Sequence, residues 1–178
     1  AFYLEDRPDR VMVVGGGYIA VEFAGIFNGY GAETTLVYRG DTILRGFDMD
    51  VRKHLMGEMD KKGINLTLNS NIERIDMVDG GLDITLTDGS VKQVDQVLYA
   101  IGRVPNTRNM GLENAGVELN DAGAIVVDDY FRTSVDNIYA LGDIIDRYQL
   151  TPVAIGEAMK LASNLLRGTN EKMDYADI

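Results

Sequence analysis

The stretch that decides the fold is Val11-Met12-Val13-Val14-Gly15-Gly16-Gly17-Tyr18-Ile19-Ala20. Four consecutive apolar residues predict a buried strand, and the spacing of apolar residues after the glycines predicts a helix. Between them lies the pattern G-x-G-x-x-A, which is typical of a dinucleotide-binding turn when a strand precedes it and a helix follows. We therefore expect Gly15 to allow a tight turn, Gly17 to let the backbone approach a pyrophosphate, and Ala20 to keep the helix close to the sheet.

The residues after the second expected strand indicate which dinucleotide binds. That strand, residues 33–38, ends at Tyr38-Arg39, and Arg45 follows shortly after. An NAD-binding unit would place an acidic residue here, about 20 residues beyond the glycine turn, to bind the ribose hydroxyls. A carboxylate would repel a 2′-phosphate, whereas guanidinium groups bind it through charge-assisted hydrogen bonds. A glycine turn or a single surface arginine is weak evidence alone, but the combination predicts NADPH.

The remaining patterns up to residue 101 predict a parallel α/β unit with an antiparallel insertion. Apolar and charge periodicity predicts helices over residues 20–30 and 48–62 and a third strand over residues 64–68. Strand, helix, strand, helix, strand is the order of a Rossmann-like mononucleotide-binding half. Short alternating strands then predict an antiparallel meander, followed by a buried strand over residues 96–101; the meander strands are 72–78, 82–87 and 90–94.

A second set of motifs lies beyond Gly102-Arg103, where the pattern breaks. A strand over residues 138–141 is expected to end at Gly142-Asp143, and ligands of open α/β sheets bind beyond the carboxyl ends of strands. The Asp143 carboxylate could accept hydrogen bonds from neighbouring hydroxyls of a sugar-alcohol chain. Thr151-Pro152 predicts the start of the last helix, with Thr151 as N-cap.

Composition excludes several classes of protein. The 178 residues carry a formal net charge of −11, which argues against nucleic-acid binding because phosphate backbones require a basic face. No apolar run is long enough for a membrane helix, and we expect a cytoplasmic protein. There is no cysteine and one histidine, His54, within a charged helical stretch; we expect no metal site and a surface position for His54.

Taken together, the motifs resemble those of the pyridine nucleotide–disulfide oxidoreductases, the flavoenzyme family that includes the glutathione reductases. The resemblance extends over almost the whole chain, and the five matching motifs occur in the family's order. They lie at residues 13–22, 38–48, 100–107, 133–143 and 150–154.

The resemblance implies a role for each residue that matches a motif. Tyr18 matches a ring that covers the flavin until the nicotinamide displaces it, and Glu22 matches an acid that pairs with a lysine outside this chain. The implied NADPH site comprises Gly15, Gly17, Tyr18, Ile19, Ala20, Glu22, Arg39, Arg45, Gly102 and Arg103. The implied FAD site comprises Gly142 and Asp143 at the ribityl chain, with Leu150 and Thr151 facing the pyrimidine edge through backbone and cap.

The resemblance also implies how the chain is organised and what it lacks. Residues 1–102 would be the NADPH-binding domain, and residues 103–178 the C-terminal segment of an FAD-binding domain, a partial second Rossmann-like unit. The family's first FAD fingerprint, its redox-active cysteine pair and its His–Glu acid–base pair do not occur in this sequence, and the chain opens at Ala1. We therefore expect a fragment of a longer enzyme.

The implied activity is NADPH-dependent reduction of a small disulfide by a homodimer, with glutathione disulfide as the first candidate substrate. Trypanothione disulfide is the alternative, and an NADH-using dihydrolipoamide dehydrogenase is a further one, disfavoured by Arg39 and Arg45. A stand-alone, non-catalytic nucleotide-binding module is the alternative outside the enzymes.

Overall fold

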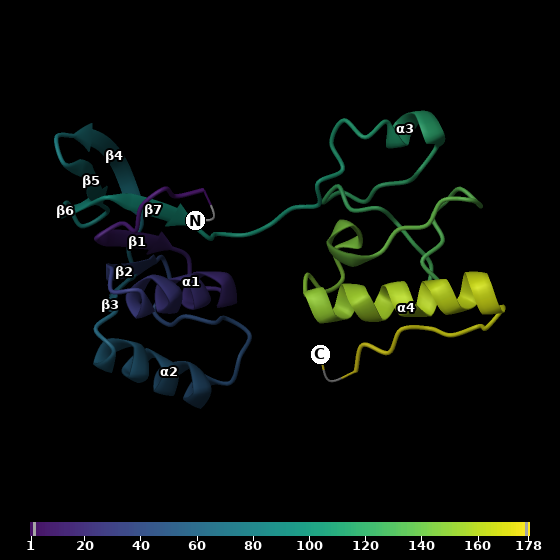
Figure 1. Ribbon diagram of the computed structural model, residues 1–178, viewed down its shortest axis with the longest axis horizontal. Coiled ribbons are helices and arrows are strands. Elements are labelled where there is room, and N and C mark those ends of the chain that lie inside the picture. The colour runs from purple at the N-terminus through teal and green to yellow at the C-terminus, as the bar shows by residue number, and fades with distance from the viewer. Residues whose placement is uncertain (2, 177) are drawn as a thin grey trace. The chain divides into compact units, whose positions relative to one another are not determined.

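The computed structural model describes residues 1, 3–176 and 178. The chain forms two compact units, Ala1–Gly102 and Arg103–Ile178 (Figure 1).

The first unit is built on a four-stranded parallel sheet with strand order β3-β2-β1-β7. Its strands are β1 (Arg10–Val14), β2 (Glu33–Tyr38), β3 (Asn65–Leu68) and β7 (Gln96–Tyr99). Helix α1 (Tyr18–Gly29) joins β1 to β2, and helix α2 (Met49–Lys61) joins β2 to β3. The predicted parallel α/β, Rossmann-like arrangement is confirmed, and His54 lies on the exposed surface of α2.

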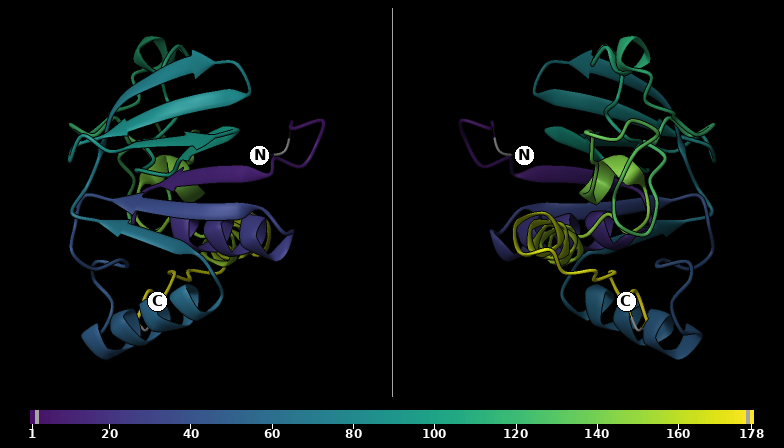
Figure 2. Two further views of the ribbon diagram at one scale, coloured as in Figure 1. Left: turned by 90° about the vertical axis from the view of Figure 1, so that its left-hand side faces the viewer. Right: turned by 90° about the vertical axis from the view of Figure 1, so that its right-hand side faces the viewer.

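Both faces of strand β1 are buried, which is why its sequence is continuously apolar. Val11 and Val13 pack against α1 and α2, whereas Met12 and Val14 face the other way and pack against a second sheet. Figure 2 shows both helices on one side of the parallel strands. Successive side chains of a strand point to opposite faces, so one short run contributes to two cores.

The second sheet is the predicted antiparallel meander, formed by β4 (Ile72–Val78), β5 (Gly81–Leu86) and β6 (Val91–Val94). Ile84, Leu86 and Val94 are buried against the parallel sheet. The alternation of apolar and polar residues in these strands therefore reflects one packed face and one solvated face.

The predicted buried strand over residues 96–101 is an exposed edge strand instead. β7 ends at Tyr99 and, among the described strands, pairs only with β1, so none of them covers its outer edge. Tyr99 is 52% exposed and Ile101 is 73% exposed. An apolar run alone does not distinguish a central strand from an edge strand, because the difference depends on which strands pair with it.

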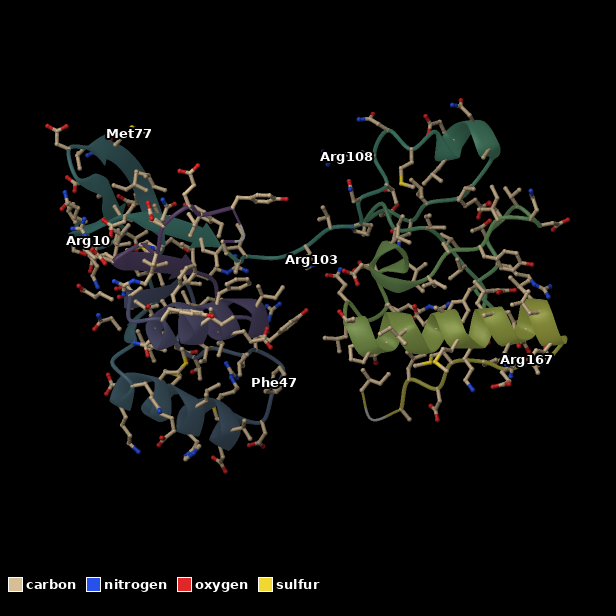
Figure 3. All side chains as sticks on the ribbon, in the orientation of Figure 1. Arg10, Phe47, Met77, Arg103, Arg108 and Arg167 are labelled. Carbon is tan, nitrogen blue, oxygen red and sulfur yellow. The ribbon has the colours of Figure 1, made fainter. Side chains whose placement is uncertain are left out.

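Arg10, labelled in Figure 3, joins the parallel sheet to the meander through its hydrogen bonds. Its guanidinium donates to the Asp95 carboxylate, to the Gly80 carbonyl and to Gln93, and its backbone N–H donates to Asp95 Oδ2 at 2.7 Å. The hydrogen bond from Arg10 holds the pKa of Asp95 below its ordinary value against the opposing effect of desolvation.

We expect Asp95→Asn to lower the thermal midpoint of the first unit by a few degrees at neutral pH. A carboxylate whose pKa is lower in the folded state stabilises that state above its unfolded pKa of about 4, and this contribution is lost as the pH falls through the folded pKa. Melting curves followed by circular dichroism should therefore converge with those of the unmodified chain in acid. The control is Asp60→Asn on the exposed surface of α2; a difference that persists unchanged in acid contradicts the role of the charge.

The second unit contains helix α3 (Leu112–Ala115), the short 3-10 helix η1 (Gly142–Ile145) and helix α4 (Thr151–Arg167). Phe131, Ile145 and Val117 are central to its core, with Leu161 of α4 packed against them. Among the described helices of the chain, none has both the length and the apolarity to cross a membrane.

The predicted strand over residues 138–141 does not form. The described residues give this segment a single antiparallel bridge, between Tyr139 and Arg132. A strand needs consecutive pairing with a neighbour to satisfy its backbone groups, and one bridge does not supply it. Asp143 consequently lies within η1 and does not follow the carboxyl end of a strand.

Candidate functional site

The glycine turn after β1 requires glycine at its first position. Gly15 has a φ of +140°, and a Cβ atom placed there would lie 2.2 Å from the carbonyl oxygen of Ala100. Its N–H donates to the Val37 carbonyl at 2.9 Å, which ties the turn to β2. Ala20 is fully buried, 3.2 Å from the same Cβ position, so α1 begins close against the turn.

Gly17 is the N-cap of α1 and lies beside open space. A Cβ atom at Gly17 would meet no other atom within 4 Å, so packing within the unit does not explain the absence of a side chain. No side chain caps α1, and its first turn contains no acidic residue. The first N–H groups of a helix lack intrahelical acceptors and carry the positive end of its dipole. This end of α1 is therefore suited to bind an anion.

The turn also positions the loop that carries Arg45, a connection that sequence reasoning missed. The backbone N–H of Leu44 donates to the Gly16 carbonyl at 2.6 Å, and the side chains of Ile43 and Leu44 are buried. A Cβ atom at Gly16 would lie 2.6 Å from the Tyr38 ring, so the ring packs directly on the turn. The apolar pair Ile43-Leu44 inside a polar loop was the signal that could have revealed this anchor.

Arg39 and Arg45 lie in the segment that follows the carboxyl end of β2, and both guanidinium groups are exposed to solvent. Arg39 directly follows β2, and Arg45 directly follows the anchored Leu44; Phe47, labelled in Figure 3, lies in the same loop. Both arginines are exposed, and neither forms a hydrogen bond or ion pair with another described residue. Guanidinium groups bind phosphates through charge-assisted hydrogen bonds, and the N-terminus of α1 is the positive end of its helix dipole, so both features are suited to anions.

The exposed surface of α1 carries Tyr18, Ile19 and Glu22. Tyr18 is the first residue of α1 and is 39% exposed, and Ile19 beside it is partly buried. Glu22 is exposed one turn further along, and residues four apart lie on the same side of a helix. Tyr18 and Glu22 therefore share one surface, which begins at the same end of α1 as the glycine turn.

Gly102 and Arg103 belong to different units. Gly102 is the last residue of the first unit and lies just beyond β7, whereas Arg103 begins the second unit. The Arg103 guanidinium donates to the Asp143 carboxylate at 2.9 Å, and both side chains are about half exposed. The resemblance assigned Arg103 to NADPH and Asp143 to FAD, so the ion pair between them is a feature that the sequence did not indicate.

The Arg103–Asp143 pair lines a pocket of about 140 Å³ in the second unit. Its other walls come from residues 104–106, from Ile144 and from Gln149. Gly142 is buried beneath this surface, which leaves Asp143 as the residue of the Gly-Asp pair that a ligand can reach.

The start of α4 differs from the prediction. Thr151 is the first helical residue, and the N-cap is Leu150, whose extended backbone (φ −131°, ψ 132°) carries the carbonyl that accepts from Ala154 at 3.0 Å. No side chain caps this helix, so the predicted cap by the Thr151 hydroxyl is wrong. Pro152 lies in the first turn and has no N–H to donate. Leu150 and Thr151 therefore lie where the backbone N–H groups at the start of α4 lack a side-chain cap.

The described residues contain no cluster of three or more histidine, cysteine, aspartate or glutamate side chains that could hold a metal ion.

A parallel sheet whose first strand leads through a glycine turn into a helix without a side-chain cap defines a Rossmann-like dinucleotide-binding protein. The model of the family described as pyridine nucleotide-disulphide oxidoreductase matches residues 1–158, and the chain belongs to that family. The predicted family and fold class are confirmed by this match and by the relatives below. Membership implies flavin and pyridine nucleotide cofactors.

Two curated relatives and one solved structure illustrate the similarity. The chain is 45% identical over 182 residues to a trypanothione reductase of Trypanosoma congolense, covering 100% of the chain and 37% of that protein. It is 47% identical over 167 residues to a glutathione reductase of Burkholderia cepacia, covering 94% of the chain and 37% of that protein. An HOCl-induced flavoprotein disulfide reductase of Escherichia coli matches with a TM-score of 0.88 and 30% identity, covering 96% and 39% of the two chains. The chain thus spans well under half the length of these proteins.

Proposed function

We propose that the first unit is an NADPH-binding domain. The observation that carries this proposal is the hydrogen bond from Leu44 to Gly16, because it holds the loop of Arg45 against the glycine turn. The open space at Gly17 and the uncapped N-terminus of α1 suit a pyrophosphate, and the unpaired Arg39 and Arg45 suit the 2′-phosphate.

The other residues of the proposed site act around this phosphate-binding region. Gly15 and Ala20 keep the turn tight and α1 close, and Ile19 contributes a backbone N–H in the first turn of the helix. Tyr18 would cover the flavin ring until the nicotinamide displaces it, and Glu22 would hold a flavin-side cation. Gly102 and Arg103 would line the NADPH groove.

We propose that the second unit is the C-terminal segment of an FAD-binding domain. Asp143 would accept hydrogen bonds from the ribityl hydroxyls, since a half-exposed carboxylate has free acceptor positions beside its bond to Arg103. Leu150 and Thr151 would face the pyrimidine edge of the flavin through the free N–H groups of α4, without a side-chain cap.

The whole protein would then be a cytoplasmic, homodimeric NADPH-dependent disulfide reductase that acts on glutathione disulfide. When bound, the nicotinamide and the flavin supply hydride and electron transfer. This chain would bind and orient both cofactors, whereas the cysteine pair that reduces the substrate would come from elsewhere in a longer protein. Trypanothione disulfide is the competing substrate, and both should be assayed in parallel because relatives of either name match about equally well.

The proposal is tested by calorimetric titration of the full chain with NADPH and with NADH. We expect NADPH to bind at least tenfold more tightly, because charge-assisted hydrogen bonds to a phosphate contribute about 1.5–3 kcal/mol each and NADH lacks that phosphate. Adenosine 2′,5′-bisphosphate should compete with NADPH. Equal affinity for the two dinucleotides would contradict the 2′-phosphate site and favour the NADH-using alternative.

A further inference from the structure

Glu157 is the only charged side chain in the buried core among the described residues. It lies on α4 and is 1% exposed. An ionised carboxylate removed from water costs several kcal/mol unless hydrogen bonds or an opposite charge compensate for it. Glu157 has no ion pair with a described residue, so its hydrogen bonds must carry the compensation.

Both carboxylate oxygens of Glu157 accept a short hydrogen bond. The backbone N–H of Gly142 donates to Oε2 at 2.6 Å, and the Tyr175 hydroxyl donates to Oε1 at 2.7 Å. Gly142 is itself buried, so its N–H would be left without an acceptor if the carboxylate were absent. The acceptor on α4 therefore fixes the orientation of the peptide between Leu141 and Gly142, directly before Asp143.

Tyr175 is held over Glu157 by several contacts of its own. Its ring stacks on Tyr148 with centroids 5.5 Å apart, and the Arg147 guanidinium lies 5.7 Å from the ring centroid. Desolvation and the bond to Glu157 raise the pKa of Tyr175 above its ordinary value, which keeps the hydroxyl protonated as a donor at neutral pH.

The segment that carries Tyr175 runs back along α4, and two of its other residues, Glu171 and Lys172, also form polar contacts with the rest of the second unit. Glu171 pairs with Lys160 of α4, and its carbonyl accepts from Asn164 at 2.8 Å. Lys172 pairs with Asp129 at 2.7 Å. Tyr175 thus reaches Glu157 from an ordered segment, and the second hydrogen bond does not depend on a freely moving side chain.

We propose that Glu157 is the positioning residue of the flavin site. Its charge-assisted bond to Gly142 holds the Gly142–Asp143 turn so that the Asp143 carboxylate faces the pocket, and the bond from Tyr175 makes the buried charge tolerable. The inference rests on the proposed function for the role of Asp143, whereas the control of the turn by Glu157 stands on the hydrogen bonds alone.

The test compares Glu157→Gln, Glu157→Ala and Tyr175→Phe in the full chain, with Glu113→Gln as the control. Glu113 lies on the exposed surface of α3. Two quantities are measured: the amide hydrogen-exchange rate of Gly142 by NMR, and the dissociation constant of FAD from the quenching of flavin fluorescence. The exchange rate requires no cofactor, so it reports on Glu157 even in a chain that does not bind FAD.

We expect exchange at Gly142 to be about tenfold faster in Glu157→Gln, because an amide oxygen is a weaker acceptor than a carboxylate by about 1 kcal/mol or more. Glu157→Ala should give a larger increase and Tyr175→Phe a smaller one, with FAD affinity falling in the same order. The glutamine variant retains an acceptor and should fold if the alanine variant does not.

Unchanged exchange at Gly142 in Glu157→Gln and Tyr175→Phe would overturn the inference. Faster exchange at Gly142 with unaltered FAD affinity would show that Glu157 holds the turn but does not position the flavin site, and would overturn the proposal. Failure of the unmodified chain to bind FAD would count against the proposed function, while the exchange rates would still decide whether Glu157 controls the turn.

Discussion

Replacing Gly15 by alanine should destabilise the first unit by about 4 kcal/mol or more, in the range that only severe backbone strain or clashes produce. Two effects add. The φ of +140° is a conformation that residues with a Cβ atom rarely adopt, and the methyl group would lie 2.2 Å from the Ala100 carbonyl oxygen. Because that oxygen belongs to the backbone beside β1, the sheet itself would have to move. Urea unfolding followed by circular dichroism measures the loss.

Gly17→Ala is the matched control, because the same substitution two residues later meets no atom within 4 Å. Its φ of −85° and ψ of 175° suit any residue. We expect a stability change of no more than about 0.5 kcal/mol, with NADPH affinity reduced at least tenfold because the methyl group occupies the space proposed for the pyrophosphate. Equal loss of stability in both variants would contradict the geometry of the turn, and unaltered NADPH affinity in Gly17→Ala would contradict the phosphate position.

Replacing Arg39 and Arg45 together by alanine should weaken NADPH binding by roughly 3 kcal/mol, on the scale of two charge-assisted hydrogen bonds to a phosphate. NADH binding should be nearly unchanged, because NADH has no 2′-phosphate. Both arginines are exposed and form no hydrogen bond with described residues, so the double variant should fold normally. Calorimetric titrations with both dinucleotides at one salt concentration give the two affinities.

Arg74→Ala controls for the loss of positive charge in general. Arg74 is a largely exposed arginine of β4 that pairs with Asp76 and lies in the meander, away from the glycine turn. Its removal should leave both dinucleotide affinities unaltered. If the double variant loses NADPH and NADH affinity equally, the two arginines do not recognise the 2′-phosphate and the preference for NADPH has another origin.

The sequence predicted the elements whose cause is local. The boundaries of β2, the start of the glycine turn and the meander could be read from apolar periodicity and turn residues, which act over a few positions. The start of α2 could also be predicted from nearby residues, because Asp48 caps the helix by accepting hydrogen bonds from the N–H groups of Asp50 and Val51.

The features that the sequence did not reveal depend on partners far along the chain. Residues 138–141 have the composition of a strand, yet their pairing is limited to the bridge between Tyr139 and Arg132. The ion pair between Arg103 and Asp143 joins residues 40 positions apart, and no local pattern marks it.

By itself, then, the sequence determined that this protein has a dinucleotide-binding parallel unit, because a strand, a glycine turn and a helix in direct succession specify that structure through neighbouring residues. Only the tertiary structure decided that β7 is an exposed edge, that Leu44 ties the loop of Arg45 to the turn, and that Glu157 is buried beneath Gly142. The physical reason is that burial and hydrogen-bond pairing are properties of segments brought together by folding, and a polar residue such as Glu157 carries no sign in its own surroundings that its charge will be removed from water.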